Sequence, residues 1–541
     1  MNTEQDQTEA PPSPAAAGPR PDWVTDELLA RWCAWVHRDA TRKGPGAAEP
    51  TTALAPHDLS PVAPVPACAP DDVASAAATA RDAQQDWART PLKRRAEIVL
   101  TFGDLLLKRQ DQVLDLIQWE TGKARYHAWQ EVAQVATLAR HYARRAGHYL
   151  GARRVRGMIP GLTKVREVRL PKGVVGIVSP WNYPLYLGVG DVLPALLAGN
   201  AVVSKADPQT ALTLLWTRSL FDEAGLPAGL WRIVSGDGPT VGTAVVDNAD
   251  YVCFTGSTAT GRTVAERAAR RLVGASLELG GKNPLIVRAD ADIAAAAAGT
   301  AVAAFANTGQ MCISIERVYV HERVYDAFRD ELVRVTEALR LGRAYDYTAD
   351  LGSLVSPAQL AAVRAHLDDA LAKGAKVLTG GRARPDIGPL FHEPTVLEGV
   401  TPDMAVCGEE TFGPVVSLYP YATDEEAVRL ANQGSYGLSA SIWSADTRAA
   451  ARMAALIRSG SVNVNDGAAA AAGSIEAGMG GMGDSGLGRR HGAEGILKYT
   501  ESQAVAVQRL MPLGPPPKQP VETFVRRTNG QLALLRRLGV R

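Results

Sequence analysis

Cysteine is scarce in this sequence: only five of the 541 residues are cysteines, and they form no C-x-x-C pair and no cluster with the nine histidines. The few, scattered cysteines argue against a disulfide framework, and the lack of a ligand-like cluster argues against a structural zinc site. We therefore expect a protein of a reducing, cytoplasmic compartment that binds no metal.

An excess of charge is also absent, since 58 Lys and Arg residues face 57 Asp and Glu residues, for a net charge of +1. This balance disfavours nucleic acid and membrane surfaces as partners, so small molecules and copies of the chain are expected. The longest weakly polar run, 293–306, is shorter than the roughly 20 residues that span a bilayer. The acidic, proline-rich start "MNTEQDQTEAPPSPAAAGPRP" predicts a disordered tail, because it lacks the apolar centre of a targeting peptide.

The chain is long enough for two or more domains, because a single hydrophobic core stops growing well below this length. A tryptophan-bearing helix is predicted near 25–37, a Pro/Ala linker at about 44–70, and long helices over 71–149. Strand-like runs then alternate with helical segments, first over 174–281 and again from 284 to about 465. This alternation predicts parallel βαβ units, and hence two α/β domains in series.

Two G-x-G-x-x-G patterns, at 478–483 and 481–486, lack the strand and the helix that a dinucleotide site needs, and a flexible loop explains them better. A better candidate is "YVCFTGSTATG", in which a strand over 251–255 runs into Gly256 and Ser257 and then into a helix. Gly256 would let the backbone approach a phosphate. Any strand-to-helix turn favours Gly and Ser, however, so this segment alone is a weak signal.

Cys312 closes the run "NTGQMC" after a long alanine-rich helix. A single free cysteine usually behaves as a small buried hydrophobe, so this residue by itself does not predict a nucleophile. Five further segments change that interpretation: "PWNYP" at 180–184, "FTGS" at 254–257, "LELGGKNP" at 277–284, "EETFGPV" at 409–415 and "SGLGRRHG" at 485–492. With these segments in this order, and with the spacing between Glu278 and Cys312, the chain from about 69 to 508 resembles the aldehyde dehydrogenases.

The resemblance implies the aldehyde dehydrogenase fold, an α/β architecture with a Rossmann-like cofactor domain, a second α/β catalytic domain and a small oligomerisation arm. The implied domains are an N-terminal extension, disordered or helical, over 1–68; the cofactor-binding domain over 69–146 and 169–280; the catalytic domain over 281–482; the arm over 147–168 and 483–510; and a C-terminal tail over 511–541. We accordingly expect a homodimer or a homotetramer.

The resemblance also implies the reaction, which is oxidation of an aldehyde to a carboxylic acid through a thiohemiacetal and a thioester on Cys312. Cys312 would be the nucleophile, activated by a helix end and the cationic cofactor, because a thiol of pKa about 8.5 is mostly protonated at neutral pH. Asn182 and the backbone amide of Cys312 would form the oxyanion hole. Glu278 would be the general base that activates the deacylating water.

A nicotinamide cofactor is implied as well. The implied contacts are Lys205, Ala206, Asp207 and Pro208 with the adenosine ribose, Gly256 and Ser257 with the pyrophosphate, Trp181 beside the catalytic Asn182, Leu279 with the nicotinamide, Glu410 with its ribose, and Phe412 with the wall beside it. Relatives that prefer NAD often have Glu where this chain has Pro208, and a carboxylate there would repel a 2′-phosphate. The sequence therefore favours NADP, with NAD as the alternative because Asp207 is adjacent.

The segments "CISIERV" and "GLGRRHG" resemble a branch of NADP-dependent succinate-semialdehyde dehydrogenases, which implies a short aldehyde with a distal carboxylate. Better-known members bind that carboxylate with two arginines, and this chain has Gly190 and Ala306 in those places. Either another cation binds the carboxylate, or the substrate is a neutral aliphatic or aromatic aldehyde. A third alternative, a CoA-acylating enzyme, is disfavoured because such enzymes usually lack the base that Glu278 supplies.

The basic tail "FVRRTNGQLALLRRLGVR" leaves two alternatives open. It could lie on an anionic membrane surface, or it could pack on a neighbouring subunit, which is the interpretation we favour. No stable membrane insertion is expected in either case.

Overall fold

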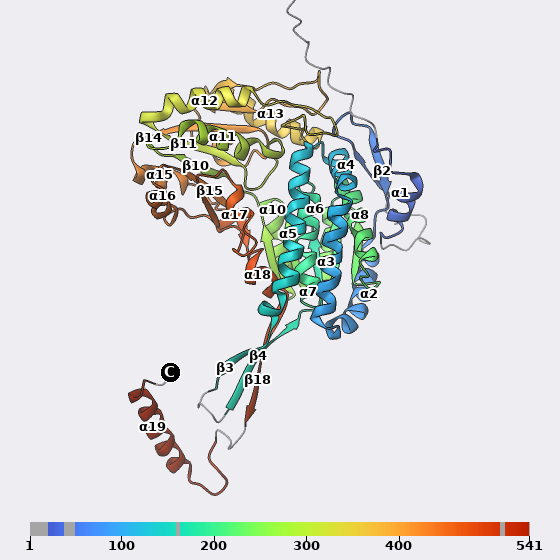
Figure 1. The fold of residues 1–541 in the computed structure, drawn as a ribbon, viewed down its shortest axis with the longest axis vertical. Helices are drawn as coiled ribbons and strands as arrows, with labels where there is room; N and C mark the ends of the chain where they lie inside the picture. Colours follow the sequence, from blue (N-terminus) through green and yellow to red (C-terminus); the bar gives the residue numbers. More distant parts are fainter. Residues whose placement is uncertain (1–19, 37–48, 158–162, 509–513, 540–541) are drawn as a thin grey trace, which may run out of the picture. The chain divides into compact units, whose positions relative to one another are not determined.

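The computed structural model describes residues 20–36, 49–157, 163–508 and 514–539. The chain divides into two compact units, the first made of 1–149 and 171–499 and the second of 150–170 and 500–541. The first unit contains two large sheets with helices packed on them (Figure 1). The second contains a three-stranded sheet and one helix.

A six-stranded sheet with the order β17–β9–β8–β5–β6–β7 forms the first half of the larger unit. Its strands are β5 (Val174–Val178), β6 (Ala201–Ala206), β7 (Trp231–Ser235), β8 (Tyr251–Thr255), β9 (Gly274–Glu278) and β17 (Gly486–Leu487). Neighbouring strands are parallel, except that β17 pairs antiparallel with β9. Strands β5 and β6 are buried along their whole length, as expected of parallel strands with helices on both faces.

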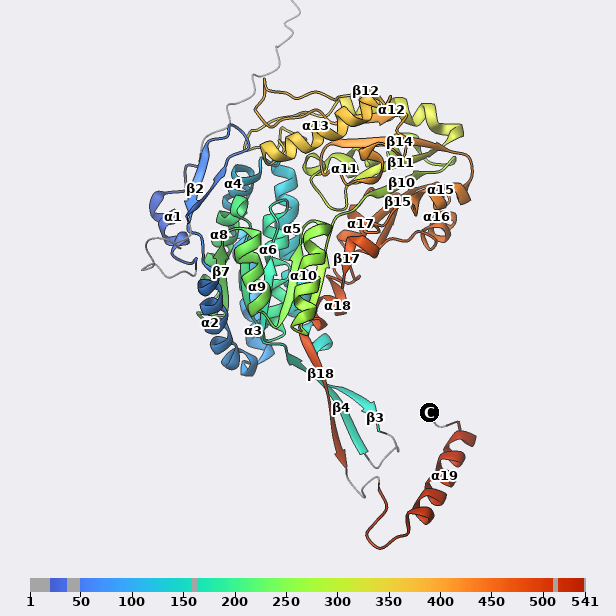
Figure 2. The same ribbon diagram turned by 180° about the vertical axis from the view of Figure 1, so that it is seen from behind.

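Helices cover both faces of this sheet. One face carries α2 (Pro70–Arg89), α9 (Thr243–Asn248) and α10 (Thr258–Arg270), which are in front in Figure 2. The other face carries α6 (Pro184–Val189), α7 (Val192–Leu197) and α8 (Ala211–Glu223), with α3 (Leu92–Lys108), α4 (Gln110–Thr121) and α5 (Arg125–Leu150) outside them. Helix α8 ends where the sequence predicts, because Gly225 has a φ of +85°, a conformation that favours glycine.

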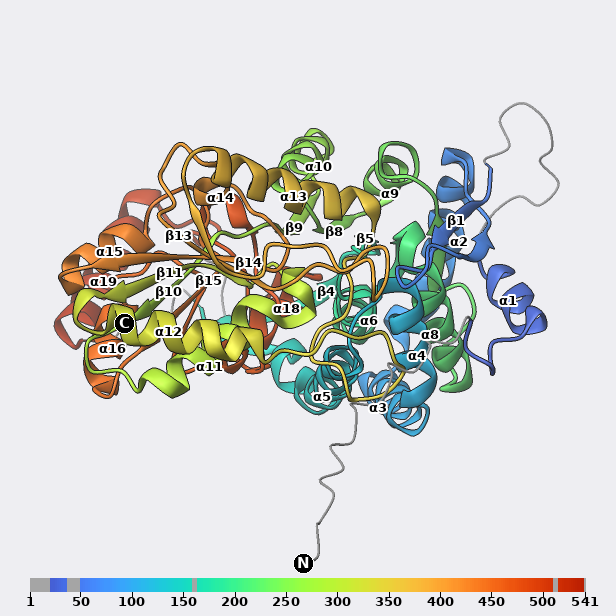
Figure 3. The same cartoon turned by 90° about the horizontal axis from the view of Figure 1, so that it is seen from above.

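A seven-stranded sheet with the order β12–β13–β14–β11–β10–β15–β16 forms the other half, and Figure 3 shows it from above. Its strands are β10 (Asn283–Val287), β11 (Ile315–His321), β12 (Lys376–Thr379), β13 (Thr395–Glu398), β14 (Val415–Tyr421), β15 (Ser439–Trp443) and β16 (Ser461–Val464). All pairs are parallel except β12 with β13. The two α/β sheets in series agree with the alternation in the sequence.

The side chains of β10 alternate between two hydrophobic clusters, as they should in a strand that is covered on both faces. Leu285 and Val287 pack with residues of α11 and α12, whereas Ile286 packs with residues of α15 and α16. The helices of this half are α11 (Ile293–Phe305), α12 (Tyr325–Glu337), α13 (Pro357–Ala372), α14 (Ala405–Gly408), α15 (Asp424–Ala431), α16 (Thr447–Ala454) and α17 (Ala469–Ala472), whereas α18 (Gly492–Leu497) packs on α7 of the six-stranded half.

The N-terminal extension differs from the prediction of a disordered or helical segment that ends in a linker. Helix α1 (Asp26–Cys33) lies where a helix was predicted, but β1 (Thr51–Leu54) and β2 (Pro61–Val65) pair antiparallel inside the predicted linker. A two-stranded sheet consists of edge strands, and edge strands tolerate proline, so the Pro/Ala composition did not exclude this pair. The predicted disordered tail over 1–19 lies outside the described residues.

The second unit consists of β3 (Arg153–Arg156), β4 (Thr163–Pro171) and β18 (Thr500–Gln508), in the order β18–β4–β3, and of α19 (Val521–Arg537). The boundary of this unit differs from that of the predicted arm, because residues 483–499 belong to the first unit. Within that segment, β17 completes the six-stranded sheet, and the carbonyl of Gly492 accepts from the Tyr142 hydroxyl at 3.1 Å. Among the helices that the structure describes, none has both the length and the apolar character needed to cross a membrane.

Candidate active site

Cys312 lies in a turn between the short 3₁₀ segment Ala306–Gly309 and β11, and a strained backbone holds it there. Asn307 and Thr308 have φ angles of 52° and 57°, in the left-handed region that residues other than glycine rarely occupy. The side chain of Asn283 donates hydrogen bonds to the carbonyls of Cys312 and Ser314, at 2.8 and 2.7 Å. The position of the thiol is therefore set by contacts on both sides of it.

The electrostatic environment of Cys312 keeps its thiol protonated in this structure. Burial, together with the nearby carboxylates of Glu278 and Glu410, raises the pKa of Cys312 to about 12, and the positive charge of Arg490 opposes this rise. A thiolate therefore needs further positive charge beside it, or a base that accepts its proton.

Asn182 follows β5 and lies against the cysteine turn. Its side-chain amide donates to the carbonyl of Gln310 at 3.1 Å, which leaves one amide hydrogen for another acceptor. The backbone carbonyl of Asn182 accepts from the ammonium of Lys123 at 2.7 Å. Lys123 is fully buried and pairs with Glu131 at 2.5 Å, and Glu131 also accepts from the first free amides of α6. This buried ion pair, which the sequence analysis missed, connects α5 to the segment that carries Asn182.

Glu278 ends β9, and its carboxylate is buried without a strong partner. The residue is 6% exposed, and its Oε1 has no hydrogen-bond partner among the residues that the structure describes. Burial raises the pKa of Glu278 to about 7, although Arg490 and Lys498 oppose the rise. A carboxyl group that titrates near neutral pH suits a general base.

The glycine-rich segment that the sequence analysis treated as a flexible loop packs against Glu278. Gly486 pairs with Glu278 across the β17–β9 contact, and a Cβ on Gly486 would lie 2.0 Å from the carbonyl oxygen of Leu277. A Cβ on Gly480 would lie 3.2 Å from Oε1 of Glu278. These glycines therefore allow the loop to approach the carboxylate closely.

The residues predicted to contact adenosine and pyrophosphate lie at the carboxyl ends of β6 and β8. Lys205 is 4% exposed, and burial lowers the pKa of its ammonium. Ala206 is buried beside it, and Asp207 caps the short 3₁₀ segment that begins at Pro208. At the end of β8, Ser257 caps α10 and accepts from the backbone N–H of Thr260 at 3.4 Å.

A Cβ on Gly256 would lie 2.7 Å from the ring of Phe254, so a larger residue does not fit this turn before α10. Helix α10 has 13 residues, so its N-terminal amides and dipole can bind an anion. The buried cation at the end of β6 and the N-terminus of α10 at the end of β8 suit the polar groups of a dinucleotide.

The predicted nicotinamide contacts lie together around Glu410. Its Oε1 accepts from the backbone N–H of Gly281 at 2.9 Å, and burial raises its pKa to about 8. Phe412 has a φ of 51° and meets the ring of Trp181 edge-on, at 5.6 Å between centroids. Leu279 packs on α10, where only a glycine, Gly261, leaves room for it.

A second buried ion pair, also missed by the sequence analysis, supports this region. Glu316 pairs with Lys282 and accepts hydrogen bonds from the backbone amides of Thr411 and Phe412. No local pattern marks such pairs, since nothing in the sequence separates these charged residues from exposed ones. Their burial is visible only after folding.

The chain belongs to the aldehyde dehydrogenase family, whose model matches residues 45–505. It is 50% identical over 456 residues to a Mycobacterium ulcerans protein named "Putative succinate-semialdehyde dehydrogenase (NADP(+)) 2", with 84% of this chain and 88% of that protein covered. A protein of Mycolicibacterium smegmatis with the same name, but without the number, is 52% identical over 452 residues, with 84% and 87% covered.

Solved structures agree with this assignment. An NADP-dependent enzyme from E. coli superposes with a TM-score of 0.82 at 31% identity, covering 85% of this chain and 95% of that one. A point mutant of betaine aldehyde dehydrogenase from Staphylococcus aureus, in complex with NAD+, superposes with a TM-score of 0.84 at 29% identity, covering 89% and 97%. The fold is therefore the aldehyde dehydrogenase fold.

Proposed function

We propose that this protein oxidises succinate semialdehyde to succinate with NADP, in the cytoplasm. The observation that carries the proposal is that Cys312, Asn182 and Glu278 lie in one site although they come from three distant segments. The carboxyl group of Glu278 has a pKa of about 7. The names of the relatives that share about half of their residues with this chain support the choice of substrate and cofactor.

In the first half of the reaction, the thiolate of Cys312 attacks the aldehyde carbon and forms a C–S bond. The carbonyl oxygen becomes an oxyanion, which accepts hydrogen bonds from the remaining side-chain N–H of Asn182 and from the backbone amide of Cys312. A bound nicotinamide would supply the acceptor for the hydride of this carbon and a positive charge that offsets the carboxylates raising the pKa of the thiol. The product of this half is a thioester on Cys312.

In the second half, Glu278 accepts a proton from a water molecule that attacks the thioester carbon. The C–S bond breaks, the carboxylic acid leaves, and the sulfur of Cys312 departs as a thiolate, which takes up the proton that Glu278 removed from water. The unpartnered Oε1 of Glu278 suits this step, because it has a free position for a water hydrogen. Lys205 to Pro208 hold the adenosine ribose, Gly256 and Ser257 the pyrophosphate, and Trp181, Leu279, Glu410 and Phe412 the nicotinamide half.

The second unit is proposed as the arm that joins subunits into a homodimer or homotetramer. β18 is an edge strand of its sheet, and Val505 and Val507 on it are exposed. An unpaired edge with exposed valines favours pairing with another chain.

Cofactor preference depends on Pro208 in this proposal. We expect a higher kcat/KM with NADP than with NAD, and we expect Pro208→Glu to lower the kcat/KM for NADP by about ten-fold or more, which corresponds to roughly 1.4 kcal/mol of charge repulsion. Steady-state kinetics with both cofactors measure this. The matched variant Pro208→Gln, which has the same size without the charge, should keep the preference for NADP. Equal use of both cofactors by the wild-type enzyme would remove the argument from Pro208.

Substrate preference is tested with succinate semialdehyde and butanal, which have the same chain length. A paired carboxylate contributes about 1.5 to 3 kcal/mol, so kcat/KM should be about ten-fold to a hundred-fold higher for the semialdehyde. Free succinate should form at the same rate with and without CoA. Equal efficiencies would indicate a neutral aldehyde as the natural substrate, and a requirement for CoA would indicate the acylating alternative.

A further inference from the structure

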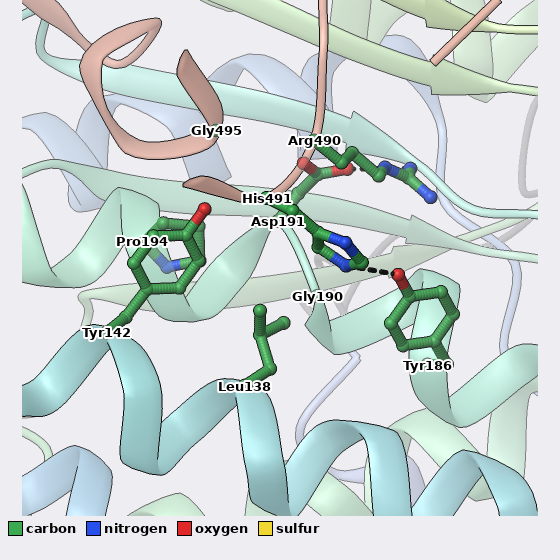
Figure 4. A pocket seen from close by; sticks show the side chains of 9 residues that line it. All are labelled: Leu138, Tyr142, Tyr186, Gly190, Asp191, Pro194, Arg490, His491 and Gly495. Atoms are coloured by element: carbon green, nitrogen blue, oxygen red, sulfur yellow. Dashed lines mark hydrogen bonds and ion pairs between the residues drawn. The ribbon is translucent and has the colours of Figure 1, made fainter. Parts of the chain in front are cut away.

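A small cavity lies between α5, α6 and the segment that follows β17 (Figure 4). Its volume is about 10 Å³, enough for one water-sized group. Its lining includes the side chains of Tyr186, Asp191, Arg490 and His491, and Gly190 contributes no side chain. The cavity lies beside the proposed active site: the backbone of Arg490 pairs with that of Met479, and the next residue, Gly480, approaches Glu278 so closely that a Cβ there would lie 3.2 Å from Oε1.

Two nitrogen atoms of the cavity-lining residues, Nδ1 of His491 and Nε of Arg490, are buried and have no hydrogen-bond partner among the described residues. His491 is 3% exposed, and burial and the charge of Arg490 lower its pKa to about 4, so the ring is neutral. Its Nε2 lies 2.7 Å from the hydroxyl of Tyr186 (Figure 4). When that hydroxyl donates its single proton to Nε2, the ring carries its hydrogen on Nδ1. Both unpartnered atoms are then N–H donors that lack an acceptor.

The charges beside the cavity are unequal. The carboxylate of Asp191 accepts from Arg490 at 2.7 Å and from Lys498 at 2.9 Å, so one anion faces two cations. The other carboxylate that acts on Arg490 is Glu278, and its pKa of about 7 leaves it partly protonated at neutral pH. Buried cations in excess favour an additional anion.

The backbone keeps the His491 ring directed at the cavity. His491 has a φ of 64°, a conformation that costs energy for any residue other than glycine and that persists where the surroundings determine it. The backbone of the preceding residue, Arg490, is fixed as well: its N–H donates to the carbonyl of Met479 at 2.6 Å, and its carbonyl accepts from the N–H of Met479 at 2.8 Å. This fixed backbone and the contact of Nε2 with the Tyr186 hydroxyl hold the ring beside the cavity.

We propose that His491 and Arg490 bind the distal carboxylate of the substrate, with one carboxylate oxygen in the cavity accepting hydrogen bonds from Nδ1 of His491 and Nε of Arg490. This inference rests on the proposed function, since it requires an aldehyde that carries a carboxylate. It supplies the positive charge that Gly190 and Ala306 do not.

The test compares kcat/KM for succinate semialdehyde and butanal in three variants. Arg490→Gln and His491→Leu should lower the ratio of the two values by about ten-fold to a hundred-fold, because the charge-assisted hydrogen bonds are lost for the acid substrate only. The matched control is Arg489→Gln: the guanidinium of Arg489 donates to the carbonyls of Gly481 and Gly488, and its charge also acts on Glu278. Its ratio should stay within about two-fold of wild type.

A second readout does not depend on turnover. Succinate should bind to the Cys312→Ala protein in calorimetry, and the added His491→Leu change should weaken that binding by about ten-fold or more. A wild-type ratio near one would overturn the proposed substrate and this inference together. A high wild-type ratio that His491→Leu and Arg490→Gln both preserve would overturn this inference alone. If Arg490→Gln does not fold, His491→Leu decides, because it leaves the ion pairs of Asp191 in place.

Discussion

Replacing Cys312 by alanine is expected to lower the rate of aldehyde oxidation by at least about a thousand-fold, because no other group can form the covalent bond to the substrate. The dissociation constant for NADPH should change by less than about five-fold, since the thiol makes the bond to the aldehyde and is not needed to hold the nucleotide. Reduction of NADP followed at 340 nm measures the first quantity, and NADPH fluorescence measures the second.

The control for this variant is Cys407→Ala. Cys407 is also a half-buried free cysteine, but it packs against the hydrophobic cluster under α13, away from the cysteine turn. The Cys407→Ala enzyme should keep full activity. Turnover that survives in Cys312→Ala would remove Cys312 as the nucleophile.

Replacing Glu278 by glutamine is expected to produce a burst of about one NADPH per active site, followed by a steady-state rate at least about a hundred-fold below wild type. Acylation and hydride transfer come before the step that this base serves, so they should continue. Stopped-flow absorbance measures the burst, and mass spectrometry of the stalled enzyme should find the acyl group on Cys312. A variant without a burst would mean that Glu278 acts in the first half of the reaction.

The pH dependence of the wild-type enzyme should report the same carboxyl group. Because burial raises the pKa of Glu278 to about 7, the base is mostly protonated below that pH and mostly ionised above it. The deacylation rate should therefore rise with pH through about 7 and fall as the solution is acidified. This rise with pH should be absent from the residual steady-state rate of the Glu278→Gln variant.

Local elements were predicted well because their signals lie within a few residues. The strand over 251–255 is β8 to the residue, α10 follows it, and the helix before Gly225 ends there because glycine adopts the positive φ that stops a helix. The pair β1 and β2 was missed because a proline-rich edge strand has the composition of a linker.

The buried ion pairs were missed for a different reason. Lys123 with Glu131, and Lys282 with Glu316, are fully or almost fully buried, but each of these residues reads in the sequence as an ordinary charged residue. Only the packing of several elements removes these side chains from water and makes their pairing necessary.

The sequence by itself determined the family, the alternation that builds two parallel sheets, and the identity of the residues proposed for catalysis, because short motifs and periodic apolar runs are local properties of the chain. The tertiary structure alone decided how those residues meet. Asn182 donates to Gln310, which is 128 positions away in the sequence. The charges of Arg490 and Lys498 act on Glu278, although these residues stand near the C-terminal end of the first unit's sequence. A pKa depends on burial and on neighbouring charges in space, so the value near 7 at Glu278 and the unpaired donors at Arg490 and His491 exist only in the folded chain.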